Sequence, residues 1–92
     1  MEIYSQIAVR IIKSQEAIIG PVAIEQAEHV PNLKIDWANH SVDITGDGTK
    51  VIDALVAKYK DLFGQISVEV SKDAAANLLS QLSPEKTPKV LQ

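Results

Sequence analysis

The sequence predicts a mainly helical α+β domain in which two helix–Gly–helix hairpins, at about 3–30 and 49–82, flank a β-hairpin at about 33–45. Three observations predict this fold. Apolar residues recur with helical spacing through most of the chain. That spacing changes to alternation of apolar and polar residues in the middle segment. Glycine interrupts each helical stretch once, Gly20 in the first and Gly64 in the second.

The first helix is predicted over about 3–19, where apolar residues form one stripe with i, i+3 and i+4 spacing. Gln15 lies on this stripe, where an apolar residue is expected. Gly20 and Pro21 then favour a stop and a restart, because glycine suits the end of a helix and proline the first turn of the next. The second helix is predicted over about 21–30 and ends before another proline.

The β-hairpin is predicted from the alternation in Leu33–Trp37 and Val42–Ile44. A two-residue turn at Asn39–His40 predicts a register whose pairs are Ala38–Ser41, Trp37–Val42, Asp36–Asp43 and Ile35–Ile44. Every apolar pair then lies on one face and every polar pair on the other. The register also places two aspartates opposite each other, which Lys34 on the same face neutralises more simply than a metal ion would.

The third helix is predicted over about 49–63 and has the strongest apolar stripe of the chain. Asp47 or Thr49 is a suitable N-cap for it. Leu55 and Phe63 lie on the stripe and are predicted to be core residues.

The stretch 65–70 fits two patterns. It alternates as a strand does, and it also begins an i+4 apolar row that continues through the following helix. A shift of 44 residues places Gly20 on Gly64 and the second helix on this stretch. The similarity favours a helix over about 65–82, although any two amphipathic helices would align their stripes at this shift.

The composition indicates a small soluble domain. The 92 residues, 46% of them hydrophobic, fit one domain at 1–82 followed by a frayed or partly ordered tail at 83–92. The absence of cysteine excludes a disulfide framework and thiol chemistry, and the net charge of −3 argues against nucleic-acid binding. Glu2, Arg10 and Lys13 interrupt the apolar N-terminal segment, so we expect no membrane span and a cytoplasmic protein.

No residue pattern predicts catalysis, a cofactor or a metal site. The segment Asp43–Gly48 imitates the start of a calcium loop, but Ala54 stands where a bidentate glutamate is needed. His29 and His40 have no partner at a spacing that indicates general-base chemistry. We therefore expect that the protein is not an enzyme. Only scattered carboxylates favour the alternative, that it is one.

The remaining features favour a regulatory or protein–protein interaction module. Its helices have wide apolar faces, and its hairpin has free edges that two copies can pair in a homodimer. The interface candidates are Trp37, Tyr4, Ile35 and Val42, of which Trp37 also fits an ordinary core position. We expect a homodimer that also binds a protein partner.

A second interpretation is a small-molecule sensor with a pocket between the helices and the hairpin. Gln15 and Tyr59 are the pocket candidates, because both are polar residues on apolar stripes. The 44-residue shift places them at equivalent positions in the two halves.

Overall fold

The computed structural model describes residues 1–92 and has the predicted mainly helical α+β fold. Its elements are α1 (Ile3–Ile19), α2 (Val22–Glu28), β1 (Leu33–Asp36), β2 (Ser41–Ile44), α3 (Gly48–Phe63) and α4 (Gln65–Leu79). The helical interpretation of 65–70 is confirmed, because α4 begins at Gln65. None of the helices combines the length and the apolar character needed to cross a membrane.

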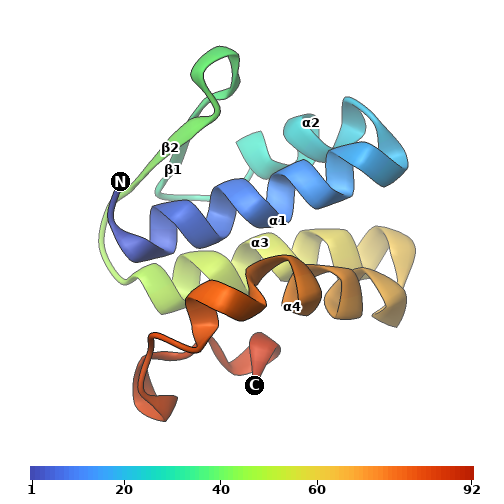
Figure 1. The fold of residues 1–92 in the computed structure, drawn as a ribbon. Helices are drawn as coiled ribbons and strands as arrows, with labels where there is room; N and C mark the ends of the chain where they lie inside the picture. Colours follow the sequence, from blue (N-terminus) through green and yellow to red (C-terminus); the bar gives the residue numbers. More distant parts are fainter.

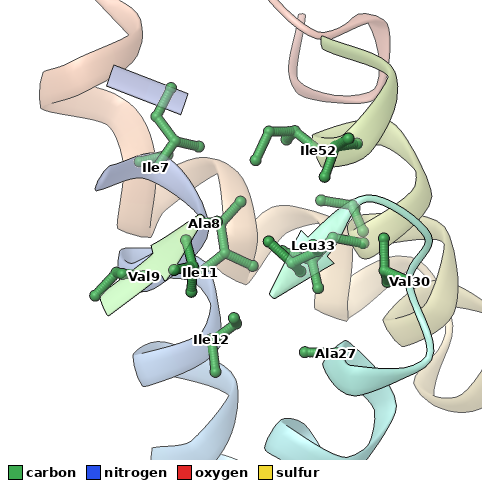
Figure 2. Packing of buried hydrophobic residues seen from close by; sticks show 14 of the residues in the cluster. Ile7, Ala8, Val9, Ile11, Ile12, Ala27, Val30, Leu33 and Ile52 are labelled. Atoms are coloured by element: carbon green, nitrogen blue, oxygen red, sulfur yellow. The ribbon is translucent and has the colours of Figure 1, made fainter. Parts of the chain in front are cut away.

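Helix α1 is the central element and contacts α2, α3, α4 and β2. Figure 1 shows the hairpin and α2 on one side of α1, with α3 and α4 on the other. Ile7, Ala8, Ile11 and Ile12 on α1 are fully buried because other elements cover their stripe. Side chains from α1, α2, β1 and α3 converge on one interior (Figure 2). One core therefore serves both helical hairpins and the β-hairpin.

A side chain caps the N-terminus of α1 and another caps that of α3. The Glu2 carboxylate accepts from Ser5 N at 2.7 Å and caps α1. Asp47 caps α3 by accepting from Thr49 N at 3.0 Å and from Thr49 Oγ1 at 2.6 Å. The hydrogen bond from the Thr49 hydroxyl is the main reason that the pKa of Asp47 is lowered. Of the two predicted caps for α3, the structure uses Asp47.

The predicted hairpin register is wrong by two residues. The observed pairs are Leu33–Ile44, Lys34–Asp43, Ile35–Val42 and Asp36–Ser41. The connection has four residues: Trp37–Asn39 form a 3-10 turn, and His40 has left-handed backbone with φ 48°. A shift of two leaves every side chain on its predicted face, since side chains alternate with period two. The lysine, rather than a second aspartate, therefore faces Asp43.

The C-terminal segment 83–92, expected to be frayed or partly ordered, folds back on the helices. It forms 3-10 turns at Pro84–Lys86 and Lys89–Leu91. Leu91 is buried, and the second turn contacts α3 and α4. Val90 N donates to Asp53 Oδ1 at 3.1 Å, which fixes the turn to α3.

Leu55 is fully buried, as predicted for the stripe of α3, but the prediction for Phe63 is wrong. Phe63 is 38% exposed. It is the last residue of α3, and the chain turns away at Gly64, so the core covers only part of its ring.

Candidate functional site

Two equivalent corners lie at the same end of the molecule, where α1 leads into α2 and α3 into α4 (Figure 1). Gly20 has φ 71° and ψ −152°, and Gly64 has φ 81° and ψ −170°. At each corner the glycine N–H donates to the carbonyl four residues earlier over 2.8 Å. This backbone conformation is open almost only to glycine. The 44-residue shift in the sequence therefore relates two structurally equivalent corners.

Gln15 and Tyr59 lie at equivalent positions, and each bonds to the other half of the molecule. Tyr59 Oη donates to the carbonyl of Ala23 at 2.7 Å, and Gln15 Nε2 donates to the carbonyl of Ser67 at 3.1 Å. The same shift relates Ala23 to Ser67, so the two hydrogen bonds are reciprocal. Burial raises the pKa of Tyr59, which keeps the hydroxyl protonated and able to donate.

These bonds place the two pocket candidates in the core. Gln15 and Tyr59 are 2% and 0% exposed, and neither lines any of the three surface hollows. Gln15 Nε2 also reaches Ser71 Oγ at 3.2 Å. Buried polar groups need hydrogen-bond partners, and here the other half of the chain supplies them. Both residues join the two halves instead of facing a pocket between the helices and the hairpin.

The largest surface hollow has a volume of about 580 Å³. Side chains of α1, the N-terminal residue and Ala74 of α4 line it: Met1, Gln6, Val9, Arg10, Lys13, Ser14 and Ala74. Arg10 and Lys13 are exposed cations at its surface. No three His, Asp or Glu side chains anywhere in the chain are grouped so that they could hold a metal ion. The hollow is thus an open depression whose walls combine the apolar Met1, Val9 and Ala74 with polar and cationic side chains.

Five large apolar side chains are exposed at the two corners: Ile18, Val22, Leu62, Phe63 and Ile66, together termed the apolar end. Ile66 and Ile18 are the most exposed of them, at 68% and 62%. The 44-residue shift relates Ile18 to Leu62 and Val22 to Ile66, so both halves contribute equivalent positions. The five expose on the order of 500 Å², taking about 200 Å² for a large side chain. Apolar patches of this size on a monomer are often functional.

The sequence prediction missed the apolar end, but a signal for it was present. An apolar doublet precedes each corner glycine, Ile18–Ile19 in the first half and Leu62–Phe63 in the second. A doublet in the middle of a helix can be buried completely, as Ile11–Ile12 is in α1. The doublets before the glycines lie where each helix ends and the chain turns, and there Ile18, Leu62 and Phe63 are exposed while Ile19 is half-buried.

The three hairpin candidates for an interface differ in their exposure. Val42 is buried in the core of its own chain, whereas Ile35 and Trp37 are half-buried. Trp37 Nε1 donates to Glu16 Oε2 at 3.1 Å, and the His40 ring lies edge-on to the indole with 4.9 Å between ring centroids. The bond to Glu16 links the hairpin tip to α1, and the contact with His40 lies within the tip. Trp37 therefore combines an intramolecular anchor with a partly exposed ring.

Tyr4 lies at the opposite end of α1 from the contact of Trp37. Glu16 follows Tyr4 by twelve positions, which correspond to about 18 Å along a helix. Tyr4 Oη donates to the carbonyl of Lys86 at 2.6 Å, and the ring covers Gly48 at the start of α3. Partial burial, followed by the charge of Asp47, raises the pKa of Tyr4. The structure thus places Tyr4 beside the C-terminal segment and does not bring it together with Trp37.

Two surfaces therefore remain for contact with another protein: the apolar end and the β-hairpin. The apolar end offers exposed large side chains, and the hairpin offers the edges of a two-stranded sheet. Comparison with known protein families, with curated proteins and with solved structures finds no match to this chain.

Proposed function

We propose that this chain is a small non-catalytic interaction module that self-associates and docks a protein partner. The apolar end carries this proposal. It gathers apolar side chains from both corners, although the same chain covers its other large apolar residues with few exceptions. The largest apolar patch of a monomer is often functional, whereas apolar residues exposed singly are ordinary.

The area of the apolar end is sufficient to contribute substantially to binding. Removing about 500 Å² of apolar surface from water is worth about 12 kcal/mol at about 25 cal/mol per Å². The loss of translational and rotational freedom on association costs about 4–15 kcal/mol. A partner that buries an apolar patch of its own against these side chains adds a further gain, and the fit between the two surfaces then sets the affinity.

The surroundings of the apolar end indicate the chemistry of the partner. Glu25, Lys60, Asp61 and Glu69 are exposed near the corners and supply charges of both signs. Apolar centres with polar rims are typical of protein–protein interfaces. The expected partner is therefore a protein with an apolar patch and a polar rim, and its binding would be the regulatory event.

Affinity capture with three forms of the chain tests the docking surface. Ile66→Lys places a charge in the apolar end, and Ala76→Lys places the same charge at an exposed position farther along α4. We expect one protein to be retained by the wild type and by Ala76→Lys and to be lost with Ile66→Lys. Retention by Ile66→Lys, or capture of no protein by the wild type, would contradict the docking role.

Light scattering tests the self-association. We expect a mass near twice the 10.0 kDa of one chain at micromolar concentration, and a mass near 10.0 kDa would contradict this part. The proposal also places the protein in the cytoplasm, and microscopy of the tagged chain in its source cell tests that location.

A further inference from the structure

The outward-facing main-chain groups of β1 have no hydrogen-bond partner in the chain. Bonded and non-bonded residue pairs alternate along an antiparallel ladder. Thr45 N donates to the carbonyl of Asn32 at 3.0 Å, which makes this a bonded pair. The alternation then makes Ile35–Val42 a non-bonded pair. Ile35 therefore directs its N–H and C=O away from β2, toward the free edge of β1.

Both strands of the hairpin have a free edge, because the sheet contains no third strand. Strand β2 packs along α1, and β1 contacts α2. Leu33 at the start of β1 is buried, whereas Ile35 farther along the strand is half-buried and lies between the exposed Lys34 and Asp36. Figure 1 shows the hairpin tip projecting beyond the helices. The edge of β1 is thus available to another strand.

The charges of β1 are complementary to a second, antiparallel copy of the same strand. Lys34 and Asp36 flank Ile35 and point to the solvent face, where both are exposed. A two-fold axis at Ile35 would place Lys34 of each copy opposite Asp36 of the other. It would also place the two Ile35 side chains together on the helix-covered face.

We propose that two copies of this chain pair antiparallel through β1 across a two-fold axis at Ile35. Each Ile35 N–H then donates to the Ile35 carbonyl of the other copy. Lys34 and Asp36 meet in non-bonded pairs, where side chains approach most closely. The result is a four-stranded sheet with β1 strands at its centre. This inference rests on the proposed self-association and names the surface that performs it.

The charges of the other edge do not complement a second copy in this way. A two-fold axis at Val42 would place Ser41 opposite Asp43 of the second copy, without an ion pair. An axis at Asp43 would place two aspartates together, which is unfavourable. The order of charges therefore selects β1 as the pairing edge.

Charge reversal tests the pairing by mass measurement. The variant Lys34→Asp has aspartate at both positions 34 and 36. The variant Asp36→Lys has lysine at both positions. We expect each variant to raise the dimer dissociation constant at least about ten-fold, because both cross-strand pairs become repulsive. When the two variants are mixed, every pair is again of opposite charge. Native mass spectrometry, with one variant isotope-labelled, should then find a heterodimer as the main dimer.

Asp73→Lys is the matched control, since it reverses the charge of an exposed aspartate on α4, outside the hairpin. It should leave the dimer intact. Circular dichroism checks that each variant is folded. If a charge reversal unfolds the chain, Lys34→Gln and Asp36→Asn replace the pair, and each should raise the dissociation constant about three-fold through loss of the ion pairs.

Four results would overturn the β1 pairing. A wild-type dimer that tolerates both reversals, or both neutral variants where these replace them, would mean that self-association stands but uses another surface. Folded variants that stay apart when mixed would also reject it, as would an equal loss of the dimer in the Asp73→Lys control. A monomeric wild type would overturn both this inference and the proposed self-association.

Discussion

Tyr59 on α3 donates a hydrogen bond to the main-chain carbonyl of Ala23 on α2 over 2.7 Å, inside the core. The bond from Gln15 to the carbonyl of Ser67 is its counterpart in the other half of the molecule. In both bonds the acceptor is the third residue after a corner glycine, and the donor comes from the other half of the molecule. Because the acceptors lie directly after the corners, the two bonds hold both corners at one end of the fold.

Tyr59→Phe should lower the free energy of unfolding by about 1–1.5 kcal/mol, because it removes a buried hydrogen bond and keeps the ring. Urea unfolding followed by circular dichroism measures the loss. Tyr4→Phe is the control, since its hydroxyl also donates to a carbonyl but lies at the surface. The loss of unfolding free energy in Tyr4→Phe should be smaller. An equal loss in both variants would show that the buried hydrogen bond stabilises the fold no more than the surface bond does.

Leu55→Ala should cost about 2–5 kcal/mol, as expected for a fully buried leucine. Phe63→Ala should cost less than about 2 kcal/mol, because much of the ring already faces solvent and truncation leaves only a partial cavity. The same denaturant titration compares the two. If Phe63→Ala proves as costly as Leu55→Ala, the corner after α3 is more closely covered than the structure shows.

Gly20→Ala and Gly64→Ala should each destabilise the fold by about 1–2 kcal/mol, since both glycines have a left-handed φ that an L-residue rarely adopts. No atom lies within 4 Å of the Cβ that either substitution would add, so the cost is conformational and not steric. Thermal unfolding of both variants should give similar losses.

D-Alanine at position 64, introduced by chemical synthesis, separates the two causes. It prefers the mirror-image backbone and should restore the stability that L-alanine removes. A D-alanine variant as unstable as the L-alanine variant would point to steric crowding instead.

Asp47→Ala should lower the melting temperature at pH 7, and this difference should shrink as the pH falls. The pKa of Asp47 in the folded chain is below its ordinary value of 3.8. The unfolded chain therefore binds more protons in this range, so the stabilisation is complete above about pH 4 and is lost as the pH falls through the folded pKa. Melting curves of both proteins between pH 7 and pH 2 measure the effect.

Thr49→Val offers a second check on the cap, because the Thr49 hydroxyl is the main cause of the lowered pKa. It should weaken the pH dependence while leaving the carboxylate in place. A gap between the wild type and Asp47→Ala that stays constant down to pH 2 would contradict the role of the ionised cap.

The sequence by itself determined the elements and their order. Helical spacing, with one glycine at each corner, predicted four helices, and alternation predicted the hairpin between them. These signals are local, because they depend on side chains a few residues apart on one face. The equivalence of Gln15 with Tyr59 was also readable, since a fixed shift in the sequence relates them.

The tertiary structure alone decided the hairpin register, because alternation with period two permits a shift of two without moving any side chain to the other face. The turn at Trp37–Asn39 and the bond from Trp37 to Glu16 on α1 choose between these registers. Tertiary packing likewise decided which polar stripe residues bond across the core. It also left the apolar end uncovered, because the elements that could cover Ile18 and Phe63 turn away at the two glycines. Whether a side chain at a corner is buried depends on the direction in which the following helix packs. Local sequence spacing does not determine that direction.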